Sequence, residues 1–119
     1  MLTFTISTGD LSIDGACVGM GYAGNGPCLN DPGACDVKMH GPLPQGMYTI
    51  GAPEDRPTTG LFSLPLTPHD QAMFGRGSFY IHGDNPRANQ SASDGCIVTD
   101  RATRELIAAM QDHLLQVVA

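Results

Sequence analysis

The sequence predicts a mostly β domain with one α-helix at its C-terminal end. Charged residues make up only 15% of the chain, which also contains 15 glycines and 9 prolines. That composition is typical of a loop-rich β domain rather than a helical bundle or a disordered chain. Short apolar runs alternate with turn residues along most of the chain, and helical spacing occurs only near its end. With 119 residues there is enough chain for one hydrophobic core, so we treat residues 1–119 as a single domain.

The first two strands are predicted from the N-terminal pattern. Leu2, Phe4 and Ile6 alternate with polar residues, which is the period of a half-buried strand. A Gly-Asp pair then predicts a turn, and Leu11–Ile13 is expected to pair back as a short hairpin. Residues 15–41 are rich in glycine, proline, asparagine and cysteine, so we expect a long irregular segment there.

Strands and connections fill the middle of the chain. Met47–Ile50 and Leu61–Leu66 have strand composition, and turn-rich connections are expected over residues 52–60 and 67–77.

Helical spacing appears only in the last stretch. Apolar residues recur there at helical intervals: Leu106, Met110, Leu114 and Val117 or Val118. Asp100 or Thr99 is suited to cap the first turn. We therefore expect one amphipathic helix over Arg101–Val117, packed on the sheet.

The charge of the chain argues against nucleic acid as a partner. The formal net charge is −6 and the sequence pI is about 4.8, whereas phosphate binding requires a surplus of lysine and arginine. No apolar run approaches the length of a membrane-spanning helix. The N-terminal residues have neither a basic region nor a long apolar region, so no ordinary secretion signal is expected.

The stretch from Phe79 to Asp100 carries the candidate chemistry. The apolar run Phe79–Ile81 predicts a strand that ends at His82, and Cys96 begins a second apolar run after a polar loop. Nucleophilic cysteine catalysis needs an imidazole near the sulfur and backbone N–H groups that stabilise an oxyanion. Gly95 permits a sharp bend and close approach of a substrate. We therefore predict Cys96 as nucleophile, with Gly95 beside it, and His82 as general base.

Each of these roles has a structural alternative. A thiol such as that of Cys96 is often simply a buried apolar group. His82 can instead bond a backbone carbonyl at a strand end, and the chain has three other histidines, His40, His69 and His113.

The motifs in this stretch carry a family resemblance. His82-Gly83, followed by the run Ser93-Asp94-Gly95-Cys96-Ile97, resembles the signature of the L,D-transpeptidase (YkuD-like) catalytic domain. The run Gly41–Ile50 resembles the Gly-x-x-Pro-x-Gly-x-Tyr-x-Ile strand of that family. The sequence of these motifs is also similar to that of the compact Tlde1-type domains of type VI secretion effectors, which act on peptidoglycan stem peptides. The resemblance covers Tyr22 to Leu106 and implies a compact L,D-transpeptidase-like β-sandwich or barrel.

Further site residues follow with their alternatives. Asp84 is expected to orient His82 or to hold a substrate ammonium group, and a turn aspartate is the alternative. Ser93 is expected to steady the cysteine loop through backbone hydrogen bonds. The resemblance implies that Tyr22 lines the cleft, although it could equally anchor a glycine-rich loop. Arg76, Arg87 and Arg101 are candidates to bind a stem-peptide carboxylate, because a planar guanidinium pairs with a carboxylate through two hydrogen bonds. For each of them singly a solvated surface position is the favoured alternative, and Arg87 is the best candidate because it lies inside the site loop.

The remaining cysteines allow two interpretations. Cys17, Cys28, Cys35 and His40 could hold zinc, but their spacings are not those of common structural sites. One disulfide would suit a periplasmic protein, and we favour Cys28–Cys35 while the pairing stays open. We expect neither a metal nor an organic cofactor.

The resemblance implies a cysteine-dependent peptidoglycan enzyme with L,D-carboxypeptidase or D-amino-acid exchange activity. An antibacterial effector toxin would be made in the cytoplasm and delivered to the periplasm of a target cell. Its expected partners are peptidoglycan stem peptides and a cognate immunity protein, and we expect a monomer. The alternatives are a phage or prophage lysis enzyme of the same chemistry and a non-catalytic peptidoglycan-binding module.

Overall fold

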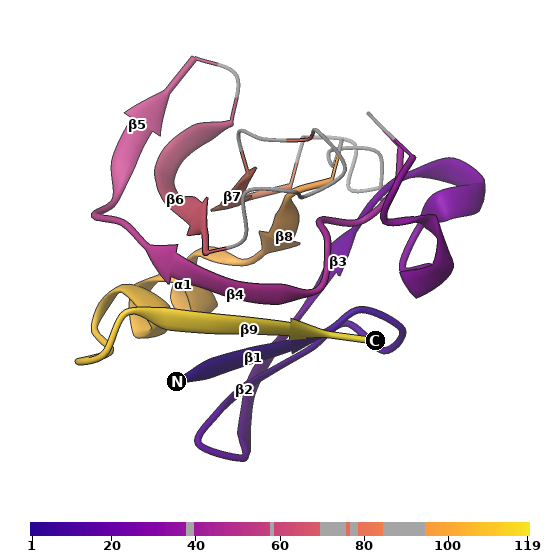
Figure 1. Cartoon of the computed structure of the whole chain (residues 1–119). Helices are drawn as coiled ribbons and strands as arrows, with labels where there is room; N and C mark the ends of the chain where they lie inside the picture. The colour runs from indigo at the N-terminus through magenta and orange to yellow at the C-terminus, as the bar shows by residue number, and fades with distance from the viewer. Residues whose placement is uncertain (38–39, 58, 70–75, 77–78, 85–94) are drawn as a thin grey trace.

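The computed structural model describes residues 1–37, 40–57, 59–69, 76, 79–84 and 95–119 (Figure 1). In chain order the strands are β1 (Leu2–Thr5), β2 (Asp10–Ile13), β3 (Ala16–Ala23), β4 (Gly46–Ile50), β5 (Glu54–Arg56), β6 (Gly60–Pro68), β7 (Phe79–His82), β8 (Ile97–Thr99) and β9 (Leu114–Val118). The helical elements are two short 3₁₀ turns, η1 (Gly26–Cys28) and η2 (Pro32–Ala34), and one α-helix, α1 (Arg101–Ala108).

The strands of the described residues form one sheet that closes on itself. Their order is β4-β9-β1-β2-β3-β8-β7-β6-β5, and β4 also pairs with β6. That additional pairing joins the two sides of the sheet into a barrel, with β5 attached outside the ring (Figure 1). Closure satisfies the backbone groups that an open sheet would leave at its edges. The prediction of a mostly β, barrel-like fold with one helix is therefore confirmed.

The N-terminal hairpin forms as the sequence predicts. β1 and β2 are antiparallel, with Leu2 opposite Ile13 and Thr5 opposite Asp10. Leu2 and Phe4 are fully buried, whereas the threonines between them are partly exposed. The alternation of side chains along a strand thus places the apolar residues of β1 in the interior.

The core lies inside the barrel and is built mainly from alternate strand residues. Its largest fully buried side chains come from both ends of the chain: Leu2, Phe4, Ile6, Leu11, Leu43, Tyr48, Leu64, Ile81, Ile97, Ile107, Leu115 and Val117. Tyr48 meets the Phe79 ring edge-on, with 6.1 Å between the ring centroids, an arrangement that aromatic pairs favour. The Tyr48 hydroxyl donates to the Pro44 carbonyl at 2.6 Å, so its polar end is also satisfied.

The C-terminal prediction is wrong beyond Ala108. The helix ends there, and Leu114–Val118 form β9, which runs parallel to β1 and antiparallel to β4. Leu115 and Val117 are buried while their neighbours are partly exposed, which is a period of two. Leu106, predicted on the buried face of a long helix, is exposed.

The start of α1 agrees with the prediction. Asp100 is the N-cap, and its Oδ1 accepts a hydrogen bond from the Thr103 N–H at 2.8 Å. A hydrogen bond with the Thr103 side chain, and then this backbone bond, lower the pKa of Asp100, which keeps the carboxylate charged. The helix contacts β6 and β3, and its Ile107 is fully buried in the hydrophobic core.

A second correction concerns residues 15–41. The first part of this segment is the strand β3, which pairs with β2 on one side and with β8 on the other. Most β3 side chains are exposed or partly exposed, so the strand lacks the apolar alternation by which it would have been predicted. The part that follows contains the two 3₁₀ turns. The short strand β5 also lies within residues 52–60, where a turn region was expected.

Candidate active site

His82 and the strand after Cys96 lie side by side in the sheet. β7 and β8 are parallel, with Ile81 opposite Ile97 and His82 opposite Val98. Both isoleucines are fully buried in the core, so the residues that alternate with them face the other side of the sheet. Extending this alternation to the residue before β8 places Cys96 beside Tyr80, on the same face of the sheet as His82. Cys96 and His82 are therefore offset by two residues, about 7 Å along the strand direction.

Backbone contacts orient both side chains. The Tyr80 N–H donates to Cys96 Sγ at 3.3 Å, and such a bond favours the charged thiolate. His82 is 5% exposed, and its Nδ1 lies 2.8 Å from the Gly83 carbonyl oxygen. Because a carbonyl oxygen can only accept, Nδ1 carries the hydrogen, and Nε2 of the neutral ring is left as the proton acceptor. A hydrogen bond from His82 to a backbone carbonyl was the structural alternative to a catalytic role. The same bond also sets the tautomer that a general base requires.

Gly95 is needed for two reasons. Its φ of +133° lies in a region that other residues rarely adopt. A Cβ at this position would also collide with Arg76 Nη2. The Gly95 carbonyl accepts a hydrogen bond from the Leu43 N–H at 2.9 Å, which ties the cysteine turn to the segment before β4.

Arg76 has a different role from the one its residue type suggested. Its Nη1 donates to the carbonyls of Cys35 and Pro42 at 2.7 Å each, and Nη2 donates to the Gly41 carbonyl at 2.9 Å. Burial lowers the pKa of this guanidinium, while the neighbouring Cys35 and Cys96 act in the opposite sense. Arg76 therefore holds the backbone around the cysteine turn and is not a solvated surface arginine.

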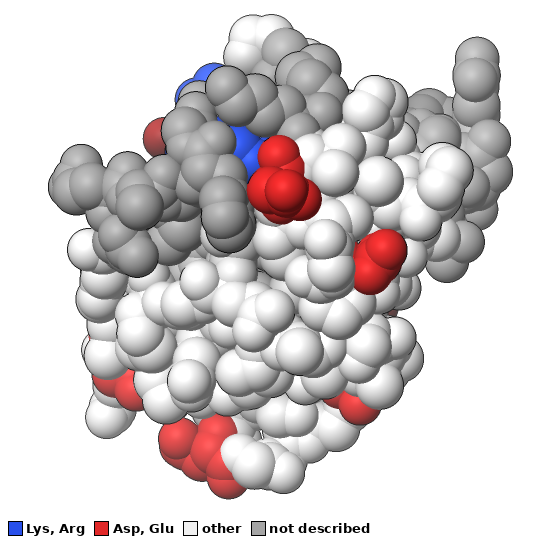
Figure 2. Space-filling view, turned by 45° about the vertical axis from the view of Figure 1, so that its right-hand side comes forward, with Lys and Arg blue, Asp and Glu red and all other residues white. Residues whose placement is uncertain are grey.

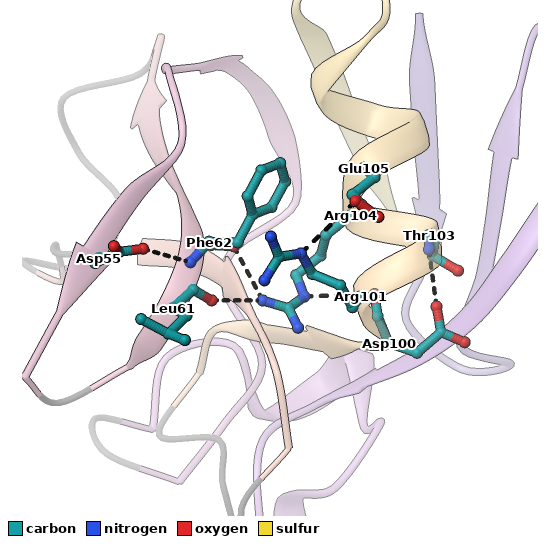
Figure 3. A network of polar contacts seen from close by, with 8 residues as sticks. All are labelled: Asp55, Leu61, Phe62, Asp100, Arg101, Thr103, Arg104 and Glu105. Atoms are coloured by element: carbon teal, nitrogen blue, oxygen red, sulfur yellow. Dashed lines mark hydrogen bonds and ion pairs between the residues drawn. The ribbon is translucent and has the colours of Figure 1, made fainter.

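Arg104 lies beside Gly83, the residue that follows His82. Figure 3 shows its polar contacts. Its Nη1 donates to the carbonyls of Leu61 and Phe62 at 2.8 and 3.0 Å, and its Nε lies 3.4 Å from the Asp100 carbonyl. The side chain is only 7% exposed. Its Nη2 is the atom nearest to where a Cβ on Gly83 would stand, at 2.8 Å. Neither the motif analysis nor the charge of the chain pointed to this residue.

Of the other two predicted arginines, only Arg101 belongs to the described residues. Arg101 is exposed, stacks over the Phe62 ring at 4.3 Å and lies 3.8 Å from the Glu105 carboxylate (Figure 3). Arg87 and Ser93 lie outside the described residues.

Tyr22 and Asp84 are brought together next to His82. Tyr22 lies opposite Val98 across the β3–β8 pair, so Tyr22, Val98 and His82 form a row across three strands. The Tyr22 hydroxyl donates to Asp84 Oδ1 at 2.8 Å. Two residues predicted to bind substrate are therefore in direct contact.

A cavity of about 550 Å³ lies beside this pair. Its walls include Met20, Tyr22, Gly83, Asp84, Asp100 and Arg104. Cys96 precedes Val98 by two residues and Asp100 follows it by two, so the cavity extends from the His82 row in the direction away from Cys96.

Comparison with known proteins agrees with this arrangement. Residues 18–118 match the family described as the Tlde1 domain. The chain belongs to the Tlde1 domain family of type VI secretion effectors. A solved L,D-transpeptidase from Mycobacterium smegmatis has a similar structure, with a TM-score of 0.55 and 17% sequence identity. The match covers 99% of this chain and 58% of that one. No match was found among curated proteins.

The family assignment made from the two motifs is thereby confirmed, as is the L,D-transpeptidase-like fold. Membership in the Tlde1 family identifies the chain as a type VI secretion effector domain.

The remaining cysteines of this Tlde1 domain do not form the predicted disulfide. Cys17, Cys28 and Cys35 are free thiols, so the expected Cys28–Cys35 bond is not present. The buried Cys35 thiol donates to the carbonyls of Pro32 and Leu43 at 3.4 and 3.6 Å, and burial raises its pKa. Its structural role is therefore that of a small buried group. Among the described residues, no three histidine, cysteine or acidic side chains are grouped as metal ligands would be.

The surface of the Tlde1 domain reflects its net charge. On the face shown in Figure 2, acidic side chains are visible at several separate places, and basic ones near its upper edge. None of the helices in the described parts of the chain has the length and apolar character needed to cross a membrane.

Proposed function

We propose that this Tlde1 domain is a cysteine-dependent acyl transferase or peptidase that acts on peptidoglycan stem tetrapeptides. Its products would come from L,D-carboxypeptidase activity, D-amino-acid exchange or both. The observation that carries the proposal is the pair of parallel strands with Cys96 and His82 on one face. The tautomer that the Gly83 carbonyl selects for His82 supports a general base directed at the thiol.

The first half-reaction removes the terminal D-alanine. His82 Nε2 takes the thiol proton, and the thiolate of Cys96 attacks the carbonyl carbon that follows the diaminopimelate (or equivalent) residue. Backbone N–H groups at Gly95 and Cys96 stabilise the oxyanion. The C–N bond then breaks, His82 returns its proton to the departing amine, and a thioester remains on Cys96.

The second half-reaction determines the product. Water attacking the thioester carbonyl gives a tripeptide, and the amine of a free D-amino acid gives an exchanged tetrapeptide. In both cases the C–S bond breaks and the sulfur regains a proton by way of His82. Either reaction consumes tetrapeptide stems and would starve normal cross-linking, which is how such an effector would damage a rival cell.

The other predicted residues have supporting roles in this proposal. Asp84 and Tyr22 bind substrate beside His82, Arg87 binds a stem carboxylate, and Ser93 steadies the loop before Cys96. The domain would act in the periplasm of the target cell, and an immunity protein that covers the cleft would protect the producer.

The test is mass spectrometry of purified tetrapeptide muropeptides incubated with the wild type, Cys96→Ala and His82→Gln, with and without D-methionine. We expect loss of D-alanine, or its replacement by D-methionine, with the wild type and neither product with Cys96→Ala. Cys17→Ala is the matched control, because Cys17 is exposed and lies in β3 away from the cysteine turn. Its products should equal those of the wild type.

Two results would contradict the proposal. Folded wild-type protein that leaves every muropeptide unchanged would favour a peptidoglycan-binding module with a structural Cys96. Activity that persists in Cys96→Ala would require a different nucleophile. Alkylation by iodoacetamide at neutral pH gives independent evidence, since an activated, accessible thiol reacts faster than a structural one.

A further inference from the structure

Arg56 lies over the face of the sheet that carries Cys96 and His82. It comes from β5, two strands beyond β7 in the sheet, and its Cζ is 4.4 Å from the centroid of the Tyr80 ring. Tyr80 is the partly exposed residue between two buried residues of β7, so its ring is on the same face as His82. The Tyr80 N–H also donates to Cys96 Sγ at 3.3 Å. A single residue therefore separates the Arg56 guanidinium from the thiol.

This guanidinium has donors that the described residues do not use. Its Nη1 donates to Glu54 Oε1 at 3.0 Å, and both side chains are more than a third exposed. Its Nε is buried without an acceptor among the described residues, and no described residue accepts from its Nη2. Such buried unpaired donors are rare in proteins. The charge of Arg56 is therefore held at this face by stacking on Tyr80 and not by backbone acceptors, which leaves it able to bind an anion.

Arg76 and Arg104 differ from Arg56 in this respect. Each of them donates to two or more backbone carbonyls, so their guanidinium groups serve the fold. The Arg56–Glu54 pair, in contrast, is exposed on both sides, and an exposed ion pair of this kind contributes little free energy. A substrate carboxylate can therefore compete with Glu54 for the guanidinium.

The distances determine which anion can reach Arg56 during the proposed reaction. The Sγ–nitrogen and ring–guanidinium contacts limit the distance from Cys96 Sγ to Arg56 Cζ to about 13 Å, counting about 5 Å across Tyr80 itself. In the amino acid that leaves, the carboxylate carbon is three bonds from the attacked carbonyl carbon. A guanidinium bonded to that carboxylate would lie about 11 Å from the sulfur. The two distances are compatible.

We propose that Arg56 binds the α-carboxylate of the amino acid that leaves in the first half-reaction, and that of the D-amino acid that enters in the second. The inference rests on the proposed function and names a specificity-determining residue of the same site. The bond would be charge-assisted, from a guanidinium N–H to a carboxylate oxygen.

The second half of this proposal follows from the symmetry of exchange. The entering amine forms a C–N bond at the thioester carbonyl while the C–S bond breaks, and an amine proton passes by way of His82 to the sulfur. This step is the reverse of the first half-reaction, so the leaving and entering amino acids occupy the same position and present their carboxylates to the same cation. Water has no carboxylate. Arg56 therefore favours exchange over hydrolysis, because an acceptor held in place reacts faster than one that must collide.

The experiment compares acceptors and donors that differ only in this carboxylate. A tetrapeptide muropeptide is incubated with D-methionine or with D-methioninamide, and mass spectrometry gives the ratio of exchanged tetrapeptide to tripeptide. In the donor arm, calorimetry compares the affinity of Cys96→Ala for the tetrapeptide and for its C-terminal amide. Arg56→Gln removes the charge. Arg101→Gln is the matched control, because Arg101 stacks on the Phe62 ring at 4.3 Å but belongs to α1.

We expect D-methionine to give an exchange-to-hydrolysis ratio about 10-fold to 100-fold higher than D-methioninamide, the range of one charge-assisted hydrogen bond. The same preference for the free carboxylate is expected in the donor arm. Arg56→Gln should reduce both preferences to nearly one, and Arg101→Gln should keep both. Glu54→Gln should increase them, because it removes the competing carboxylate and leaves Arg56 in place.

The outcomes separate this inference from the proposed function. Equal ratios for the two acceptors with an active wild type would overturn the assignment of Arg56 and leave the cysteine chemistry in place. A preference that survives in Arg56→Gln would overturn it as well. If Arg56→Gln does not fold, the exposed Glu54→Gln variant decides, and a preference no greater than that of the wild type would refute the assignment. Carboxylate-dependent binding that Arg56→Gln abolishes, without any turnover by the wild type, would support the assignment and overturn the proposed reaction.

Discussion

Replacing Arg76 tests whether the cysteine turn is held by a partly buried guanidinium. The side chain joins the carbonyls of Cys35, Gly41 and Pro42 and lies against Gly95. Arg76→Met keeps much of the aliphatic volume but removes all three donors and the charge. Arg76→Lys keeps the charge, but an ammonium group lacks the planar fork that reaches several carbonyls at once.

The expected cost follows from the contacts. A hydrogen bond to a charged group contributes about 1.5 to 3 kcal/mol, and a buried acceptor left without a donor costs about 1 to 3 kcal/mol. Because Arg76 is only partly buried, we take the low end for each carbonyl and expect a loss of about 3 kcal/mol in Arg76→Met. Arg76→Lys should lose about half as much, since lysine retains one or two of these bonds. Either value is a large fraction of the ~5 to 15 kcal/mol by which domains of this kind are stable.

The assay has two readouts in a Cys17→Ser, Cys28→Ser background. Urea unfolding gives the free energy of unfolding, and the pH dependence of iodoacetamide alkylation reports the reactivity of Cys96. Cys35 contributes little alkylation, because it is buried and burial raises its pKa. The loss of a neighbouring positive charge disfavours the thiolate, so the alkylation profile of Arg76→Met should move to higher pH.

Arg101→Met is the control, because that arginine is exposed and its nearest carboxylate is 3.8 Å away, also exposed. It should lose no more than about 1 kcal/mol. If Arg76→Met unfolds at the same urea concentration as the background protein, the guanidinium does not hold the turn. If stability falls but the alkylation profile does not move, the role of Arg76 is purely structural.

Three further substitutions test the fold around the site. Leu115→Ala in β9 should lower the free energy of unfolding, measured with urea, by about 3 kcal/mol. Leu106→Ala, at an exposed helix position, should lower it by less than about 1 kcal/mol. Similar losses for the two variants would contradict the assignment of β9 as a core strand. Tyr48→Phe should lose about 1 kcal/mol, because the buried Pro44 carbonyl loses its donor, and no loss would show that this bond contributes nothing. The lowered pKa of Asp100 implies stability that is present above its ordinary pKa and lost as pH falls through the lowered value. The stability difference between wild type and Asp100→Asn should therefore vanish in acid, and a difference that persists there would exclude the charge as its cause.

The sequence was most informative where structure is set locally. β1, β2, β4, β6 and β7 all follow from short apolar runs bounded by turn residues. The His82–Cys96 neighbourhood could be predicted because each residue adjoins a strand and two strands joined by a loop commonly pair. Their parallel direction could not be deduced in the same way, since the polar loop gives no sign of whether it turns back or crosses over.

The errors arose where a tertiary partner decides the structure. The spacing of Leu114 and Val117 is compatible with both helix and strand, and pairing with β1 and β4 on both sides favours the strand. β3 has too few buried side chains to show a period, and its backbone pairing with β2 and β8 holds it in place. Tertiary hydrogen bonding overrides local propensity in both cases.

The structural roles of Arg76 and Arg104 were not predicted for a related reason: a guanidinium that binds carbonyls across the fold has no sequence partner. Arg76 was considered only as a carboxylate-binding residue, and Arg104 was not considered. A signal did exist. The chain has only six lysine and arginine residues, so each one is unusual in an acidic domain. Arg76 is followed by glycine, and Arg104 stands four residues after the N-cap of α1, near enough to reach back to the Asp100 carbonyl. Asking which backbone carbonyls each of these few cationic side chains can bind would have pointed to the structural roles of both arginines.

The positions of these arginines suggest why the two proposed catalytic motifs contain glycine. Gly83 follows the proposed base and gives space to Arg104, whereas Gly95 precedes the proposed nucleophile and gives space to Arg76. Each arginine binds carbonyls of a separate segment, so the ends of β7 and β8 are fixed from two sides. A fixed backbone is what an oxyanion site requires, because donors that are already oriented need no reorganisation when charge develops. Gly83→Ala should therefore impair turnover by displacing Arg104 without touching Cys96, and wild-type kcat/KM in a folded Gly83→Ala protein would refute this link between packing and catalysis.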